Sequence, residues 1–285
     1  MKNIRIKCPA KINLTLEVVG KRDDGFHNIK SVMQLISLYD YLDISVAESD
    51  KTEIYLGGNS TEIPYNSSNL VYKAAEAYLK KINKTVRVEI SIEKNIPVAA
   101  GLAGGSTDGA GTIFGLNELF ERPIPKYELH NLCAQLGSDL NVCLEGGTLL
   151  ATSRGECIRR LKTVNMPVTL IKPKSLGISA KEAYTKYAQK EFKPQNNMTE
   201  KMINALEIGE DIKPYLYNDL EYAIFDDYKE LQFIKSKLPN SIMSGSGSTY
   251  FILEDLKNIE FPDEYEVICG AEFIPNGVGI AELAS

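Results

Sequence analysis

The sequence contains no tryptophan, two histidines, and five cysteines that never occur as a C-x-x-C pair. Without clustered histidines and cysteines we expect no structural metal site, because zinc needs four closely placed N or S ligands. The odd, scattered cysteines argue against a disulfide framework and favour reduced thiols. The chain also has no apolar run of about 18 residues, so no transmembrane helix is expected.

The N-terminal residues 1–7 alternate apolar and charged side chains, which predicts a first strand and not a signal peptide. Together with reduced thiols, this predicts a cytoplasmic protein. The net charge of −6 argues against nucleic acid or a membrane as the main partner. A small anionic ligand stays compatible, since a local basic pocket can lie in an acidic protein. A monomer and a weak homodimer are equally compatible with the sequence.

Residues 97–107 read P-V-A-A-G-L-A-G-G-S-T and are too rich in glycine for a helix or strand interior. Residues 86–92 before them alternate as a half-buried strand, and residues 106–120 after them have helical spacing. A loop between a strand and a helix N-terminus suits a phosphate group. It matches neither the Walker A motif nor G-x-G-x-x-G. The alternative is a turn that only packs the helix on the strand.

The rest of the chain mixes strands and helices without a strict βαβ rhythm, which favours an α+β fold. Asn69 is placed to cap one helix, and another is expected over 126–136, ended by Gly137. A hairpin is expected over 146–158. We place the domain boundary just after the turn of this hairpin, giving domains 1–155 and 156–285.

Two charged residues are candidates for chemistry. Lys11 is expected at a strand start beside Pro9, where a lysine is often merely solvated. Asp139 is expected at a helix start, where capping alone would explain it. Its apolar neighbours predict burial, and a buried carboxylate needs a partner such as Lys11.

A turn at Asp24-Gly25 is followed directly by Phe26 and His27. Such a pair either packs against the protein or holds a flat heterocycle by stacking and hydrogen bonding.

Eight motifs now stand in order along the chain: P-A-K-I-N-L, D-G-F-H, N-L-V-Y-K-A-A, the glycine-rich loop, L-G-S-D, R-G-E, N-D-L-E and M-S-G-S-G-S. Together they resemble the motifs of the GHMP kinase superfamily, over residues 9 to about 250. The closest resemblance is to the branch that phosphorylates a cytidine-diphosphate alcohol in the non-mevalonate isoprenoid pathway. The resemblance implies a two-domain α+β fold with the active site in the cleft between domains.

The resemblance also implies roles for individual residues. Lys11 and Asp139 correspond to the catalytic pair, Asn69 and Lys94 to the adenosine end of the nucleotide site, and Gly245 to a supporting third turn. Asn13, Phe26 and His27 correspond to residues that hold the cytidine-diphosphate alcohol, with Tyr184 a further candidate. The ATP phosphate loop is Pro97, Val98, Ala99, Ala100, Gly101, Leu102, Ala103, Gly104, Gly105, Ser106 and Thr107. ATP and Mg²⁺ are the implied cofactors, with Ser106 or Thr107 as candidate Mg²⁺ contacts.

Some positions depart from the family pattern. Ala103 replaces a usual glycine, which is tolerable if its φ is negative. Thr107 replaces a usual serine, and Phe26 a usual tyrosine. Gly109 and Gly111 stand in the helix where alanine is usual, at about 0.8–1.0 kcal/mol each. Helix propensity gives no reason for these two glycines, and they put the efficiency of the phosphate site in question.

The sequence therefore predicts an ATP-dependent kinase acting on a cytidine-diphosphate alcohol. Two alternatives stay open at this point. One is a kinase of the same superfamily with another small alcohol as substrate. The other is a non-catalytic nucleotide-binding protein on the same fold, although retention of both Lys11 and Asp139 argues against it.

Overall fold

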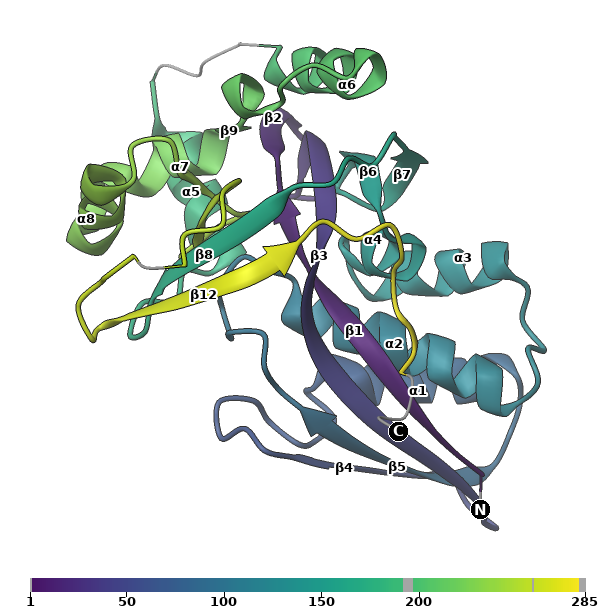
Figure 1. The fold of residues 1–285 in the computed structure, drawn as a ribbon. Helices are drawn as coiled ribbons and strands as arrows, with labels where there is room; N and C mark the ends of the chain where they lie inside the picture. The colour runs from purple at the N-terminus through teal and green to yellow at the C-terminus, as the bar shows by residue number, and fades with distance from the viewer. Residues whose placement is uncertain (1, 192–196, 258, 282–285) are drawn as a thin grey trace.

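A computed structural model describes residues 2–191, 197–257 and 259–281. Two β-sheets with helices packed on them form an α+β fold, as predicted (Figure 1). The long strand β3 (His27–Glu48) is the centre of the larger sheet and pairs with β1 (Lys2–Asn13), β2 (Thr15–Lys21), β5 (Val86–Glu93) and β6 (Thr148–Ser153). The edges carry β4 (Glu53–Gly58) beside β5 and β7 (Cys157–Arg160) beside β6.

The expected position of Lys11 at a strand start was wrong. Strand β1 runs through Pro9 without a break, and its register with β3 shifts between Pro9 and Ala10. A proline lacks the N–H that a regular ladder needs, so it fits at an irregularity of this kind. Lys11 consequently lies inside a buried stretch of β1, with Ala10 and Ile12 fully buried beside it.

Four helices pack with the larger sheet: α1 (Leu70–Lys81), α2 (Gly104–Leu119), α3 (Lys126–Leu136) and α4 (Leu140–Glu145) (Figure 1). The helix expected over 106–120 begins two residues earlier, at Gly104. Apolar side chains of these helices and of β1, β3 and β5 form one core cluster.

Gly111, one of the two glycines of α2 that helix propensity left unexplained, has a packing role, which it shares with Gly115. A Cβ atom on Gly111 would lie 2.3 Å from Cys8 Sγ, and one on Gly115 would lie 2.7 Å from Ile44 Cδ1. Real Cβ atoms do not approach other atoms so closely, so these two positions let α2 lie directly against β1 and β3. The glycines therefore determine how closely α2 packs on the sheet. The N-terminus of α2 forms the end of the glycine-rich loop.

The smaller sheet has the order β10 (Ile242–Met243), β11 (Tyr250–Ile252), β8 (Pro167–Pro173) and β12 (Tyr265–Glu272). Helices α5 (Ala180–Gln189), α7 (Asp219–Ile224) and α8 (Lys229–Lys237) share a core with it. Helix α6 (Met198–Ile208) contributes to another cluster with β1 and β3. Two 3₁₀ turns, Lys213–Tyr215 and Phe225–Asp227, connect these helices.

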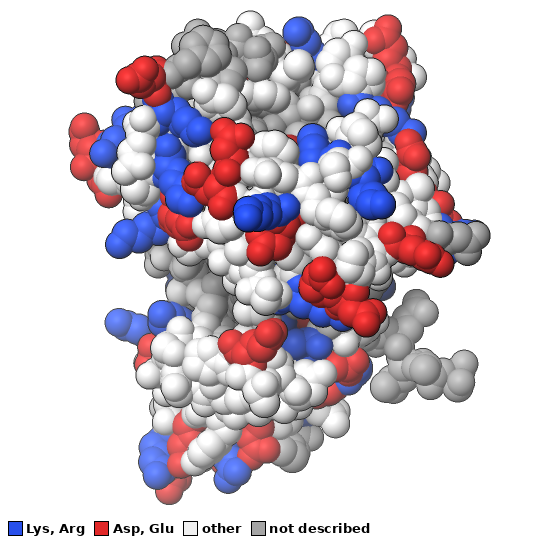
Figure 2. Space-filling view, turned by 90° about the vertical axis from the view of Figure 1, so that its left-hand side faces the viewer, with Lys and Arg blue, Asp and Glu red and all other residues white. Residues whose placement is uncertain are grey.

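Late segments of the chain return to the larger sheet. Strand β13 (Gly279–Ile280) pairs with β1, and β9 (Tyr217–Asn218) pairs with β2. The division into 1–155 and 156–285 stays a prediction. No helix of the described residues is long and apolar enough to cross a membrane. On the face drawn in Figure 2, basic and acidic side chains are interspersed.

Candidate active site

Lys11 and Asp139 meet although they are far apart in the sequence. Lys11 Nζ lies 3.6 Å from Asp139 Oδ2. The lysine side chain is 4% exposed, whereas the carboxylate is 28% exposed. A small molecule can therefore approach the carboxylate while the ammonium group stays beneath it.

The other contacts of the Lys11 ammonium fix its position. Nζ donates hydrogen bonds to Asn13 Oδ1 at 2.8 Å and to the carbonyl oxygen of Gly101 at 3.0 Å. An ammonium group has three N–H donors. Two of them are held by neutral acceptors, which leaves the third for Asp139 or a ligand beside it.

Asp139 stands at the N-cap position of α4, yet its side chain accepts no capping hydrogen bond. Capping, the alternative explanation for this residue, is therefore wrong for its carboxylate. The short helix α4 is held instead by burial of Leu140, Val142 and Cys143.

The glycine-rich loop leads into an uncapped helix N-terminus. Ala103 at the N-cap of α2 has no side chain that accepts a hydrogen bond, and no acidic residue lies in the first turn. The first backbone N–H groups of a helix lack partners within it and carry partial positive charge. Space above Gly105 is open, because an added Cβ there would meet nothing within 4 Å.

A cavity of 320 Å³ lies against this helix end. Its walls contain most of the predicted phosphate loop, residues 97–106, together with Asn69 and Lys94. Thr107, the last predicted loop residue, is fully buried beside the Cys143 thiol instead. The arrangement of cavity, helix N-terminus and open glycine suits a phosphate chain.

The loop has three residues in the left-handed region, of which Ala99 has φ +51°. Gly101 has φ +76°, and a Cβ on it would lie 2.0 Å from the carbonyl oxygen of Ser244, so only glycine fits. Ala103 has φ +59°. The condition under which an alanine was expected to be tolerated here, a negative φ, is not met.

Residues 244–247 form the third turn and lock into the loop. Ser244 Oγ donates to the carbonyl oxygen of Gly101 at 3.0 Å, and Thr249 N donates to that of Ala100 at 3.3 Å. A Cβ on Gly245 would lie 3.2 Å from Lys11 Nζ. The turn therefore touches both the loop and the lysine.

Asn69 and Lys94 line the cavity, but their side chains already make hydrogen bonds and ion pairs within the protein. Asn69 Oδ1 caps α1 by accepting from Val71 N at 2.9 Å, and its Nδ2 donates to Pro64 O. Lys94 Nζ contacts Asp40 Oδ2 and, at 3.0 Å, Asp108 Oδ2. Their predicted role toward adenosine stays a prediction.

Lys94, Asp40 and Asp108 form a buried triad under the first turn of α2. Their side chains are at most 6% exposed. Asp40 Oδ1 also accepts from Asn95 N and Ile96 N at 2.6 and 2.8 Å, while Asp108 Oδ1 has no hydrogen-bond partner. Burial raises the pKa of the Asp108 carboxyl to about 8, against the opposing pull of Lys94.

The predicted acceptor side of the site gathers from both halves of the chain. The His27 and Tyr184 rings stack with centroids 5.0 Å apart and an interplanar angle of 13°. Phe26 is 52% exposed, with the Arg154 guanidinium 5.1 Å from its ring centroid. Asn13 is buried, accepts from Lys11 Nζ and donates to Ser31 Oγ, so Lys11 and Ser31 occupy its side chain.

Sequence reasoning missed Asp40 and Asp108. A signal for Asp40 exists, because it shares the strand parity of Leu42 and Ile44, which are buried. An acidic residue on the apolar face of a strand needs a buried cation. Asp108 carries no such signal, since its position in α2 looks like any polar helix residue.

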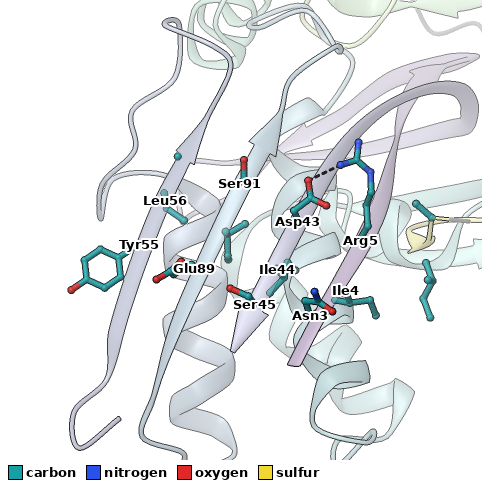
Figure 3. Close-up of a pocket in the computed structure, with 14 residues that line it drawn as sticks. Asn3, Ile4, Arg5, Asp43, Ile44, Ser45, Tyr55, Leu56, Glu89 and Ser91 are labelled. Atoms are coloured by element: carbon teal, nitrogen blue, oxygen red, sulfur yellow. Dashed lines mark hydrogen bonds and ion pairs between the residues drawn. The ribbon is translucent and has the colours of Figure 1, made fainter. Parts of the chain in front are cut away.

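A larger cavity is a groove elsewhere, on the face of the larger sheet opposite α1 and α2 (Figure 3). Its volume is 920 Å³, and its described walls include Arg5, which donates to Asp43 Oδ2 at 2.6 Å. None of the predicted site residues lines it. Size alone therefore does not locate the chemistry in this molecule.

The chain is similar to proteins of one enzyme family. A model of the GHMP kinases N terminal domain matches residues 69–147. A 4-diphosphocytidyl-2-C-methyl-D-erythritol kinase of Carboxydothermus hydrogenoformans is 38% identical over 260 residues, or 88% of this chain and 89% of that protein. The enzyme of the same name from Syntrophomonas wolfei is 41% identical, over 86% of this chain and 87% of that one.

Solved structures agree on the fold. A crystal structure of a 4-(cytidine 5'-diphospho)-2C-methyl-D-erythritol kinase superposes with a TM-score of 0.76 and 28% identity, over 95% of this chain and 99% of that chain. The homoserine kinase of Cytophaga hutchinsonii has a TM-score of 0.75 at 15% identity, over 99% and 98% of the two chains, and supports the fold alone. The predicted α+β GHMP kinase fold is confirmed. The chain belongs to the 4-diphosphocytidyl-2-C-methyl-D-erythritol kinase family of the GHMP kinase superfamily.

Proposed function

We propose that this active site transfers the γ-phosphoryl group of ATP to the 2-hydroxyl of 4-diphosphocytidyl-2-C-methyl-D-erythritol, in the methylerythritol phosphate route to isoprenoid precursors. Membership of the family makes the chain a phosphotransferase, and GHMP kinases use ATP. One observation carries the assignment of the site. Lys11, which pairs with Asp139, donates to the carbonyl oxygen of Gly101, and Gly101 lines the cavity at an uncapped helix N-terminus.

Asp139 acts on the acceptor hydroxyl in this proposal. Its carboxylate is free of capping duty and partly exposed, so it can accept the hydroxyl proton as the oxygen attacks phosphorus. Lys11 Nζ lies 3.6 Å from Asp139 Oδ2, so its positive charge holds the carboxylate in place beside the acceptor hydroxyl. The same ammonium group stabilises negative charge that develops on the attacking oxygen.

The loop holds the phosphates. The first residues of α2 line the cavity and have no side-chain cap, and the open space at Gly105 allows a phosphate oxygen to approach the backbone. Ser106 is the candidate hydroxyl for Mg²⁺, because it lines the cavity whereas Thr107 is buried. Mg²⁺ usually keeps several waters and binds one or two protein oxygens plus substrate phosphates, which this donor set fits. When bound, the ion neutralises charge on the transferred phosphoryl group.

The aromatic cluster supplies selectivity for the cytidine. The stacked His27 and Tyr184 rings and the exposed Phe26 ring offer flat surfaces and hydrogen-bonding groups near the catalytic pair. Burial raises the pKa of the Tyr184 hydroxyl, and the neighbouring Asp139 carboxylate raises it further. Tyr184 therefore stays a neutral hydroxyl that can donate a hydrogen bond to the substrate.

A coupled assay of ADP release tests the proposal. We expect turnover with ATP, Mg²⁺ and 4-diphosphocytidyl-2-C-methyl-D-erythritol, and far lower turnover when the acceptor is methylerythritol 4-phosphate, which lacks the cytidylyl group. Equal turnover of the two acceptors would contradict cytidine recognition and favour a kinase of another alcohol. ATP binding without turnover of either acceptor would contradict the proposed reaction.

A further inference from the structure

The start of α7 carries three buried polar side chains that the mechanism above does not use, Asn218, Asp219 and Glu221, and the first and last of these contact the active site. Asn218 is 2% exposed and Glu221 is 7% exposed. They stand three positions apart, so they lie on the same side of the helix start. Both contact residues 243–245, which run from the end of β10 into the third turn.

Asn218 uses every polar atom of its side chain. Its Oδ1 caps α7 by accepting from Leu220 N at 2.8 Å. Its Nδ2 donates to the carbonyl oxygens of Met243 at 2.7 Å and Gly245 at 2.8 Å. The backbone beside it pairs with β2 at Leu16, which anchors the asparagine to the larger sheet.

Glu221 binds a backbone N–H of the same segment. Its Oε2 accepts from Met243 N at 2.9 Å, and its Oε1 lies 3.0 Å from Lys235 Nζ. The two side chains therefore bind one donor and two acceptors of the backbone around Met243. Because these contacts hold both N–H and C=O groups of the segment, they fix its position relative to α7.

The segment held in this way is in contact with the reacting groups. Gly245 lies against Lys11 Nζ, and a Cβ on it would also lie 3.0 Å from the carbonyl oxygen of Gly101. That carbonyl accepts from Lys11 Nζ and from Ser244 Oγ, both at 3.0 Å. A shift of the third turn would thus move the loop and the lysine together.

We propose that Asn218 and Glu221 are positioning residues, which hold the third turn so that Lys11 and Gly101 keep their geometry during phosphoryl transfer. The inference rests on the proposed function for its catalytic readout. The plain alternative is that Asn218 only caps α7. The two differ in what the loss of the Nδ2 donors does, because capping needs Oδ1 alone.

Asn218→Asp tests this directly. Aspartate keeps the shape and the capping oxygen but loses both donors and turns an acceptor toward two carbonyl oxygens. Asn117→Asp is the matched control. Asn117 is 5% exposed, and its Nδ2 likewise donates to a carbonyl, that of Ile124 at 3.1 Å, near the far end of α2.

We expect kcat of Asn218→Asp to fall about ten- to a hundredfold, since small misplacements of reacting groups have effects of that size. The KM for the cytidine substrate should be unchanged, and Asn117→Asp should keep kcat within about threefold of wild type. Asn218→Ser, which retains a capping oxygen, should lose activity similarly if Asn218→Asp fails to fold. Equal kcat in folded Asn218 and Asn117 variants would overturn the inference.

Glu221 offers a rescue by conservative substitution. Glu221→Gln keeps an acceptor for Met243 N and should retain kcat within about threefold, whereas Glu221→Ala should lose about tenfold. Loss in both variants to the same extent would show that the ion pair with Lys235 matters instead, and would contradict the positioning role.

The dissociation constant for ATP, measured by calorimetry, separates the inference from the proposed function because it needs no acceptor. The third turn supports the loop at Gly101, so Asn218→Asp should weaken ATP binding about tenfold and Asn117→Asp should not. An inactive wild type would refute the proposed function. The inference would then be tested by comparing the ATP affinities of Asn218→Asp, Asn117→Asp and wild type. Unchanged affinity in Asn218→Asp would count against it.

Discussion

Asp139 occupies the N-cap of α4, yet its carboxylate lies 3.6 Å from Lys11 Nζ and caps no backbone N–H. A helix start without a capping bond is less stable by about 1 kcal/mol. The helix lacks this local stabilisation at a carboxylate that contacts Lys11, and Lys11 in turn contacts the loop at Gly101 and the third turn at Gly245. Conflicts between local stability and side-chain placement are expected at functional sites.

Ala103 is predicted to be strained by its left-handed conformation, with φ +59° and ψ +28°. Ala103→Gly should raise the free energy of unfolding by about 0.5–1 kcal/mol, because glycine adopts this conformation without a Cβ clash. Ala110→Gly, in the interior of the same helix, should lower it by about 1 kcal/mol or more. Urea unfolding of the two variants compares them. Destabilisation of similar size in Ala103→Gly and Ala110→Gly would contradict the prediction that Ala103 is strained.

Gly111 is predicted to be required for the close packing of α2 against β1. Gly111→Ala should lower the free energy of unfolding by about 1–3 kcal/mol, because the new methyl group would lie 2.3 Å from Cys8 Sγ. Cys8→Ala should relieve part of that loss in the double variant. Gly109→Ala is the matched control, since its Cβ would lie 3.1 Å from Leu70 Cγ, the branch of a movable side chain.

A double-mutant cycle of Cys8→Ala and Gly111→Ala measures this coupling. Contacting residues show interaction energies of about 0.5–3 kcal/mol, whereas independent sites add. Additive effects would mean that the two positions do not touch in solution.

Asp108 should make stability depend on pH. Its pKa is raised to about 8 in the fold, whereas an unfolded aspartate titrates near about 4. Between these values the folded state binds more protons than the unfolded state, so the free energy of unfolding falls as pH rises. The contribution is fully present below about pH 4 and is lost as the pH passes about 8.

Asp108→Asn cannot titrate, so it should lack this pH-dependent loss. Relative to wild type, the variant should become steadily more stable from about pH 5 to about pH 8, measured by urea unfolding. Asp40→Asn should reduce the pH-dependent loss without abolishing it, because the Asp40 charge raises the pKa of Asp108 in addition to burial. Parallel curves for wild type and Asp108→Asn would contradict a protonated Asp108.

Tyr184 is predicted to serve the acceptor and not the nucleotide. Tyr184→Leu removes the ring stacked on His27 and should raise the KM for the cytidine substrate about tenfold, since stacking on a base contributes about 1–3 kcal/mol. The KM for ATP should be unchanged. Tyr222→Leu, at a 38% exposed tyrosine of α7, should change neither constant. An effect of Tyr184→Leu on the KM for ATP alone would contradict the assignment.

Local patterns predicted much of the fold. Alternation predicted β5, helical spacing and an asparagine cap predicted α1, and glycine marked the end of α3. The strand-start position of Lys11 was wrong because a register shift at Pro9 lets β1 continue, and no local pattern announces such a shift.

The site depended on contacts between distant segments. Gly111 is explained only once Cys8 is known to lie opposite it, and Asp108 only once Lys94 and Asp40 lie beside it. Lys11 and Asp139 are candidates from the residues alone, but their roles and that of Gly245 come from the resemblance of several motifs together. From sequence spacing alone, Lys11 would be a solvated lysine and Asp139 a helix cap.

The most direct test of the account is single-turnover phosphoryl transfer by Asp139→Asn, with ATP affinity measured on the same sample. Asparagine keeps the size of the side chain but cannot accept the hydroxyl proton. We predict a loss of about 10²–10⁴-fold in the transfer rate, with ATP affinity within about threefold of wild type. A folded Asp139→Asn enzyme that transfers phosphate at a rate close to wild type would contradict the assignment of Asp139 as the base.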